Sequence, residues 1–447
     1  MKKFIETLKN IYKIEDLRSR LGVTLFLLLI YRLGSYVSLP GVDPAQLEQL
    51  RNQTSEGLLG LLDMFSGGAF SKASIFALGI MPYISASIVV QLLGIAVPYF
   101  QRLQKEGESG RRKVNQLTRY LTVIILLFQA PAYLINLHGI IPATAFAVTG
   151  TLFTVTSTII LTASSMFIMW LGERITDKGI GNGISLIIMI GIIARLPHSV
   201  VAEFISRIEQ QGGGMVMFLL EFVVLFFVFM ASILLVQGTR KIPVQYAKRI
   251  VGNKQYGGVR QYIPLKVNAA GVMPIIFAQA IMFIPITIAG FAKSDSLSGF
   301  AAAFADHTGF WYNLTQFLLV IIFTYFYTAI TVNPLQMAED MKKNGGFIPG
   351  VKPGKKTVEF LDTVMSRITL PGSIFLGIVT ILPAFAMIAG INQQFSYFFG
   401  GTSLLILVGV VLDTLQQIES HLLMRHYDGL MKTGRIKGRS GGGAAAY

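Results

Sequence analysis

The chain has no cysteine, which excludes disulfide bonds and thiolate metal sites. Its five histidines are scattered along 447 residues and lack the spacing typical of metal ligands. There is no His-Glu-x-x-His motif, no nucleophile elbow and no pair of inward-facing acids, so the sequence predicts neither an enzyme nor a bound cofactor. Charged residues are also scarce, at 14% of the chain, whereas soluble domains average about 25%.

Apolar residues make up 53% of the chain and are gathered into long runs. About 20 consecutive apolar residues cross the hydrocarbon core of a bilayer as a helix. Ten runs meet this requirement, so the sequence predicts a polytopic α-helical membrane protein. The predicted spans are Leu21–Val37, Ser74–Pro98, Tyr120–Leu137, Thr151–Leu171, Ile180–Leu196, Met215–Val236, Val267–Phe291, Phe310–Val332, Ile368–Ala389 and Thr402–Leu422.

Lysine and arginine are distributed unevenly around these spans. Ten spans put both termini on one side, and nearly all of the 38 cations then lie on that side. They gather at the two ends of the chain and in the loops Gln101–Arg119, Gln237–Lys266 and Pro334–Arg367. Because positive loops stay in the cytoplasm, we predict cytoplasmic N- and C-termini.

Titratable residues are nearly absent from the spans, with Arg32, Glu221 and Asp413 as the main exceptions. Ion-coupled carriers usually bury carboxylates, histidines or cation pairs at mid-membrane. For Arg32 we therefore favour a structural role over an ion-coupling role. The scarcity of such groups weighs against an ion-coupled carrier.

One pattern of eight residues occurs twice. The segments Gly79–Ala86 and Gly271–Ala278 share Gly-x-Met-Pro-x-Ile-x-Ala, and both lie inside apolar runs. Since a proline within a helix removes a hydrogen bond, we expect two kinked helices. Kinked helices at matching places in two halves indicate an internal repeat with a path between them, as in transport proteins. The alternative is a chance recurrence of residues that are common in membrane helices.

The segment Leu58–Lys72 lies between the first two spans and is too short to cross a bilayer. Gly67 and Gly68 would break a helix before it reached full length. Two interpretations are open: an amphipathic helix on the outer surface, or a re-entrant element that acts as a movable stopper.

Several long runs resemble the bacterial SecY family of protein-conducting channels. The run Phe65–Ser87 is similar to the plug and following helix of that family. The resemblance extends from about Lys2 to Lys437. Further matching runs are Lys105–Arg112, Gly172–Ser185, Pro264–Pro274 and Phe399–Ile406.

The resemblance implies an all-α polytopic membrane protein with ten transmembrane helices in two inverted five-helix halves and a short re-entrant plug helix. The first half is then 21–200, with the plug at 58–72. The second half is 201–422, with cytoplasmic loops at 237–266 and 334–367. Residues 1–20 and 423–447 are expected to be cytoplasmic, and the chain is expected in the bacterial cytoplasmic (inner) membrane.

The resemblance also implies a function: passage of unfolded secretory polypeptides across the membrane, with sideways release of hydrophobic segments through a lateral gate. Matching the family motifs assigns three sets of residues. The expected pore ring is Ile80, Ile84, Ile184, Ile188, Ile276 and Ile406. The expected plug residues are Leu61, Leu62, Met64, Phe65, Ser66, Gly67 and Gly68. The expected gate residues are Ser85, Gln129 and Asn268.

The partners implied are small SecE-like and SecG-like membrane subunits, the SecA motor ATPase, the ribosome, membrane lipid, and nascent secretory and membrane proteins with signal sequences. Docking of ribosome and motor is expected at Arg240, Lys241, Lys248, Arg249 and Lys352. Lys352 stands where the family usually has arginine, and lysine lacks the planar fork that binds two oxygens at once.

Two other classes remain as alternatives. A secondary transporter of a small solute also uses inverted repeats and kinked helices. It is disfavoured by the scarcity of intramembrane titratable groups and by the plug-like segment. A membrane-embedded enzyme is disfavoured because the sequence shows no catalytic set.

Overall fold

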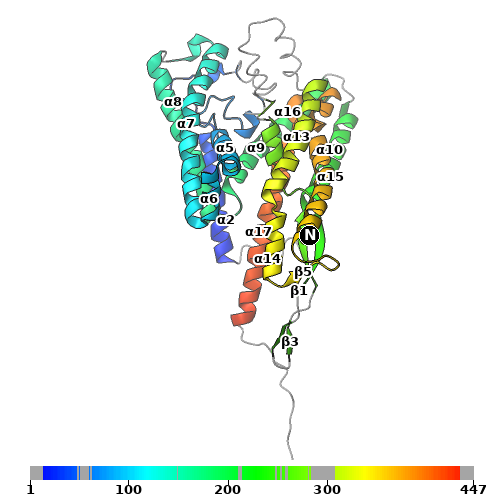
Figure 1. The fold of residues 1–447 in the computed structure, drawn as a ribbon. Helices are drawn as coiled ribbons and strands as arrows, with labels where there is room; N and C mark the ends of the chain where they lie inside the picture. The colour runs from blue at the N-terminus through cyan, green and yellow to red at the C-terminus, as the bar shows by residue number, and fades with distance from the viewer. Residues whose placement is uncertain are drawn as a thin grey trace, which may run out of the picture.

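Two groups of helices stand side by side in the computed structural model (Figure 1). It describes residues 14–47, 50, 60, 63–147, 150–209, 214–246, 249–251, 254–256, 260–279, 281–282 and 308–432. The first group holds α2 (Glu15–Gly34), α5 (Met81–Ala96), α6 (Pro98–Lys105), α7 (Glu108–Ile140) and α8 (Thr151–Lys178). The second holds α10 (Gly214–Gln237), α13 (Phe310–Thr331), α14 (Pro334–Lys343) and α15 (Lys355–Ile388). Between the groups lie α9 (Gly183–Glu209), α16 (Gln393–Ser396) and α17 (Gly401–Lys432).

Among the residues that the structure describes, seven of the predicted spans are helices long and apolar enough to cross a membrane. They are α7, α8, α9, α10, α13, α15 and α17. The first predicted span coincides with α2, which is 20 residues long and carries arginines at both ends. Residues 280 and 283–291 of the predicted span Val267–Phe291 lie outside the described residues. The architecture is therefore mostly helical, as predicted.

The repeated Gly-x-Met-Pro pattern forms two helix starts. Residues 66–80 are turns, and α5 begins at Met81, not at the predicted Ser74. Gly79 has φ 55° and Gly271 has φ 65°, and a helix begins two residues after each, at Met81 and at Met273. The predicted proline kinks are wrong because proline suits the first turn of a helix, where its fixed φ is compatible and its missing N–H is not needed.

The two long loops that were predicted to be cytoplasmic fold together, which the sequence did not predict. Strand β1 (Thr239–Tyr246) pairs antiparallel with β4 (Arg260–Lys266) and with β5 (Gly346–Phe347), and a separate pair joins β2 (Arg249–Val251) to β3 (Lys254–Tyr256). Side chains of alternate residues in β1, Ile242 and Val244, are buried against α14 and the start of α15. Strands β1, β4 and β5 of the two loops therefore form one packed unit with α14 and the start of α15 (Figure 1).

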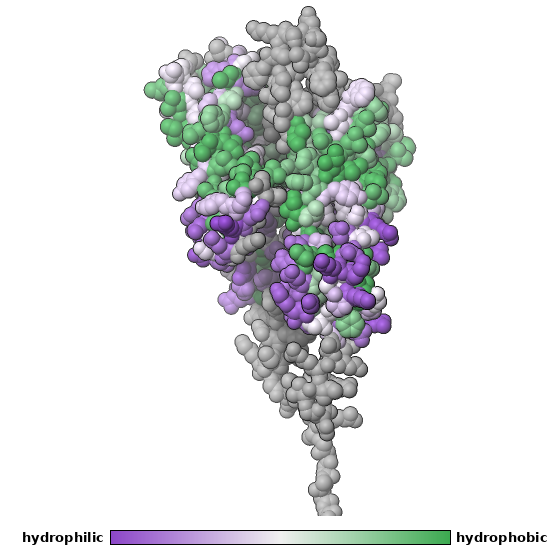
Figure 2. All heavy atoms as spheres, in the orientation of Figure 1, coloured by the Kyte–Doolittle hydropathy of each residue, from purple (hydrophilic) through white to green (hydrophobic). Residues whose placement is uncertain are grey.

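The surface divides into two zones along the long axis (Figure 2). On the face shown, hydrophobic residues form a green belt across the upper helices, and hydrophilic residues gather over the lower part, towards α14 and the strands. Many side chains in the belt are large and exposed, such as Phe226 and Phe128. Such a belt is too extensive for a protein in water and matches a surface in contact with lipid.

Candidate functional site

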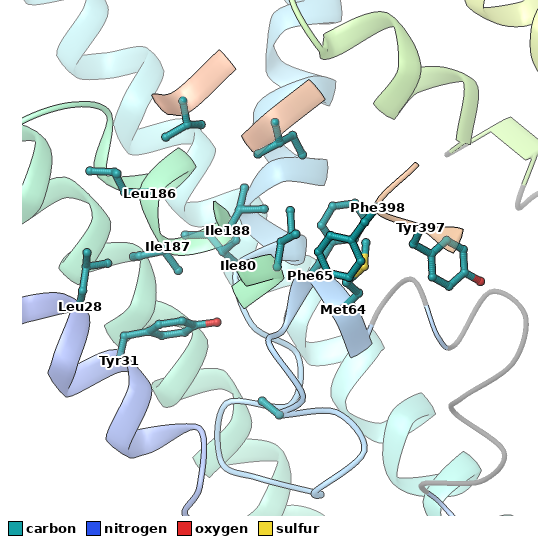
Figure 3. Close-up of a cluster of buried hydrophobic side chains, with 14 of the residues drawn as sticks. Leu28, Tyr31, Met64, Phe65, Ile80, Leu186, Ile187, Ile188, Tyr397 and Phe398 are labelled. Carbon is teal, nitrogen blue, oxygen red and sulfur yellow. The ribbon is translucent and has the colours of Figure 1, made fainter. Parts of the chain in front are cut away.

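An apolar cluster fills the centre of the molecule between the two groups of helices (Figure 3). Leu28 and Tyr31 come from α2, Leu186–Ile188 from α9, and Phe395–Phe399 from α16 and the turn after it. The cluster combines residues far apart in the sequence, which lie on both sides of the boundary between the halves.

Five of the six predicted ring residues belong to this cluster. Ile80, Ile188 and Ile406 are buried within it, and Ile84 and Ile184 pack against it half-buried. Ile80 and Ile188 lie next to one another at the centre of Figure 3. The sixth, Ile276, is half-buried in the first turn of the helix that begins at Met273, and it is not among the described members of the cluster.

The predicted plug is a series of turns rather than a continuous helix in the part that the structure describes. Helical residues occur at 63–65, and turns follow from Ser66. Met64 and Phe65 are buried in the central cluster, close to Phe398 (Figure 3). Leu61 and Leu62 lie outside the described residues. The segment from Asp63 to Lys72, at the position of the predicted plug and hereafter called the plug segment, thus packs into the central apolar cluster.

Polar side chains of the first group of helices hold the backbone of the plug segment. Tyr31 Oη donates to the Ser66 carbonyl at 3.2 Å, and Arg32 Nη1 donates to the Gly67 carbonyl at 2.9 Å. From α7, Tyr133 Oη donates to the Phe70 carbonyl at 3.2 Å. Since a buried carbonyl without a partner is costly, these donors stabilise the turns. Arg32 therefore has the structural role that the sequence favoured.

Two glycines allow the plug segment to approach α9 closely. Gly67 has φ 67°, and a Cβ built on it would lie 2.9 Å from the Gly191 Cα. A Cβ on Gly191 would in turn lie 3.0 Å from the Phe65 carbonyl oxygen. Both positions are therefore closed to larger residues unless the backbone shifts.

The three predicted gate residues lie on three different segments. Ser85 is half-buried in α5, Gln129 is exposed on α7, and Asn268 is buried in the turn before Met273. Among the described residues, no hydrogen bond joins any two of them. A hydrogen bond that joins α5 to α13 instead connects the Tyr327 hydroxyl to Gln91 Oε1 at 2.7 Å. The sequence did not identify this pair, because 236 residues separate its members.

Comparisons with known proteins decide the family. The SecY family model matches residues 74–415. The protein translocase subunit SecY of Streptomyces galbus is 42% identical over 440 residues, which cover 94% of this chain and 98% of that protein. The SecY subunit of Chlamydia muridarum is 41% identical over 456 residues, covering 97% and 99%. This chain belongs to the SecY family.

Solved structures show the same fold. A protein-conducting channel has a TM-score of 0.59 at 19% identity and covers 90% of this chain and 92% of its own. A SecY channel whose plug domain is described as stabilising the closed state and maintaining a membrane seal has a TM-score of 0.60 at 19% identity, with the same coverage. Canine Sec61 in a ribosome–channel complex has a TM-score of 0.55 at 18% identity and covers 90% and 92%.

In this SecY-family chain, polar contacts join both ends of α9 to neighbouring elements. At one end, the Gly181 N–H donates to Gln417 Oε1 of α17 at 2.8 Å. At the other, the Asn392 N–H donates to Glu203 Oε2 at 2.7 Å. There Arg207 also pairs with Glu203 at 2.8 Å and with Glu221 of α10 at 2.5 Å, and all three side chains are buried. Glu221 is thus a partner in a structural ion cluster.

Three of the five predicted docking residues lie on the packed unit that the two loops form. Arg240 and Lys241 are exposed on β1, and Lys352 is exposed just before α15. Arg249 belongs to β2, and Lys248 lies outside the described residues. Within the described part of the chain, no three His, Asp or Glu side chains group closely enough to hold a metal ion.

Proposed function

We propose that this chain is the channel subunit of a protein translocase and that the central apolar cluster is its constriction. In this role it passes unfolded secretory polypeptides across the membrane and releases hydrophobic segments sideways into lipid. The observation that carries the proposal is the seating of Met64 and Phe65 among Ile80, Ile188 and Ile406, between the two halves. A small-solute carrier has no support among the relatives.

The chemistry of the constriction suits this role. A narrow apolar passage dewets, and so it blocks ions without a tight mechanical lid. Branched aliphatic side chains form no sequence-specific hydrogen bonds, so they can close around any extended backbone. The plug segment adds a second layer to the seal while no substrate is present.

Sideways release requires that α5 and the helices facing it separate at modest cost. Hydrogen bonds between membrane helices average about 0.6 kcal/mol. The Gln91–Tyr327 bond is of this kind. An apolar helix that enters between α5 and α13 can replace the side-chain packing around this bond. We place Ser85, Gln129 and Asn268 on the same separating boundary.

Energy for transport comes from partners in this proposal. The basic surface of the cytoplasmic unit, with Arg240 and Lys241, suits the phosphates of ribosomal RNA. The SecA motor ATPase docks on the same unit, and SecE-like and SecG-like subunits surround the helices. The chain then lies in the bacterial inner membrane with both termini in the cytoplasm, as the cation distribution predicts.

The test is transport by purified components. The chain would be reconstituted into vesicles with SecE-like and SecG-like subunits, and a secretory polypeptide would be added with SecA and ATP. We expect the polypeptide to become protected from external protease, and a polypeptide without a signal sequence to remain accessible. Transport of small solutes without polypeptide transport would contradict the proposal.

A further inference from the structure

The plug segment begins with a buried carboxylate. The Asp63 side chain is 1% exposed, and its Oδ1 accepts a 2.7 Å hydrogen bond from the Ser71 N–H. The Asp63 carbonyl accepts from Ser66 Oγ at 3.0 Å and from the Gly68 N–H at 2.8 Å. These hydrogen bonds to Asp63 hold the turns of the plug segment together. An ionised carboxylate at such a site requires a partner of opposite charge.

The partner comes from α9. Arg195 forms an ion pair with Asp63 Oδ2, and its Nη2 also donates to Ser71 Oγ at 3.0 Å. Arg195 follows Gly191 by one helical turn, so the two residues lie on the same face of α9. That face therefore offers the plug segment a site of close backbone approach at Gly191 and a positive charge at Arg195.

The second half of the molecule contributes a different kind of contact. Phe398 and Tyr397 pack in the same apolar cluster as Met64 and Phe65 (Figure 3). Apolar surfaces are non-directional and can separate when the halves part. A buried ion pair depends on geometry, because each charge left alone in the interior is destabilising.

We propose that Arg195 is the residue that positions the plug: its ion pair with Asp63 holds the plug segment on α9 in the sealing position. The inference rests on the proposed role of this segment as a seal. The Arg195 side chain then sets the equilibrium between the seated and the displaced position of the plug segment.

The experiment measures resting ion conductance of the reconstituted channel complex in planar bilayers. Arg195→Gln leaves the buried Asp63 carboxylate without its counter charge, and we expect the leak to rise at least ~10-fold. Asp63→Asn should raise the leak less, because Arg195 is 20% exposed and can turn towards water. Arg195→Lys keeps the charge and should restore most of the seal.

The double variant Asp63→Asn/Arg195→Gln provides the decisive comparison. It removes both charges and keeps an amide oxygen that can accept from the Ser71 N–H, so its leak should fall well below that of Arg195→Gln. A residue needed merely for folding would not show this rescue. Arg119→Gln, which breaks the exposed Arg119–Glu173 pair between α7 and α8, is the matched control and should leave conductance unchanged.

Two outcomes would contradict the inference in distinguishable ways. If deletion of residues 61–70 raises the leak but Arg195→Gln does not, the plug seals without Arg195. If the deletion itself leaves the leak unchanged, the proposed sealing role of the segment fails. Should Arg195→Gln not fold, Arg195→Lys and the double variant still decide: a double variant as leaky as the deletion would overturn the positioning role.

Discussion

The Tyr327 hydroxyl in α13 donates a 2.7 Å hydrogen bond to Gln91 Oε1 in α5, and so it connects the two halves of the molecule. Gln91 is itself oriented by a second contact, because its Nε2 donates to Ser87 Oγ at 3.3 Å. The bond lies on the boundary that must open for sideways release.

Tyr327→Phe should make the gate easier to open. The change removes one interhelical hydrogen bond, which is worth about 0.6 kcal/mol or roughly a threefold shift in an equilibrium. We expect increased export of a reporter protein that carries a defective signal sequence. Tyr325→Phe, two residues earlier on the same helix, is the control. Equal effects of the two substitutions would show that the bond to Gln91 is not responsible.

Polar substitution in the ring should hydrate the constriction. Ile406→Asn and Ile84→Asn place an amide among apolar side chains, where burial without a partner costs on the order of 1–3 kcal/mol. Water that satisfies the amide would loosen the seal, so ion leak and export of the defective-signal reporter should both rise. Ile406→Val keeps the site apolar and should have little effect. The ring assignment is wrong if polar substitutions at none of the six positions change either measurement.

Gly191→Ala should displace the plug segment from α9. The added methyl group would lie 3.0 Å from the Phe65 carbonyl oxygen and 3.2 Å from the Gly67 nitrogen. Crowding of this kind costs about 1–3 kcal/mol unless the backbone moves. We expect a higher resting conductance with little loss of helix content. Gly409→Ala in α17 has no heavy atom within 4 Å of its new methyl group and serves as the control.

Charge reversal on β1 should weaken ribosome binding. Arg240→Glu/Lys241→Glu removes two exposed cations, and the salt dependence of binding should become shallower by about one unit of slope for each lost phosphate contact. Sedimentation with ribosomes at several salt concentrations measures this. Arg111→Glu/Arg112→Glu makes the same change in net charge at exposed positions of α7. If both pairs weaken binding equally, general charge and not the β1 surface is responsible.

The sequence predicted the long spans well because length and apolar composition are local properties. Helices α7 and α15 begin at Glu108 and Lys355, before the predicted spans that start at Tyr120 and Ile368, because the apolar runs used to predict spans do not include the charged residues at the beginning of each helix. Five of the ring isoleucines assigned by the family motifs lie in or against one apolar cluster, and their role as a pore ring stays a prediction. The supports of the plug could not be predicted in this way. Tyr133 and Arg195 act on backbone carbonyls and turns whose positions depend on tertiary packing.

The two matched helix starts have a consequence for hydration. The first N–H groups of a helix have no partner within it, and inside an apolar region each would hold a water molecule or remain unsatisfied. Here Pro82 and Pro274 have no N–H at all. The Ile80 carbonyl then accepts from both Tyr83 and Ile84, at 3.1 Å each, and the Val272 carbonyl accepts from Ile275 and Ile276 at 3.1 and 3.4 Å. Each helix can therefore begin beside the constriction while carrying few bound waters into a place that must stay dry.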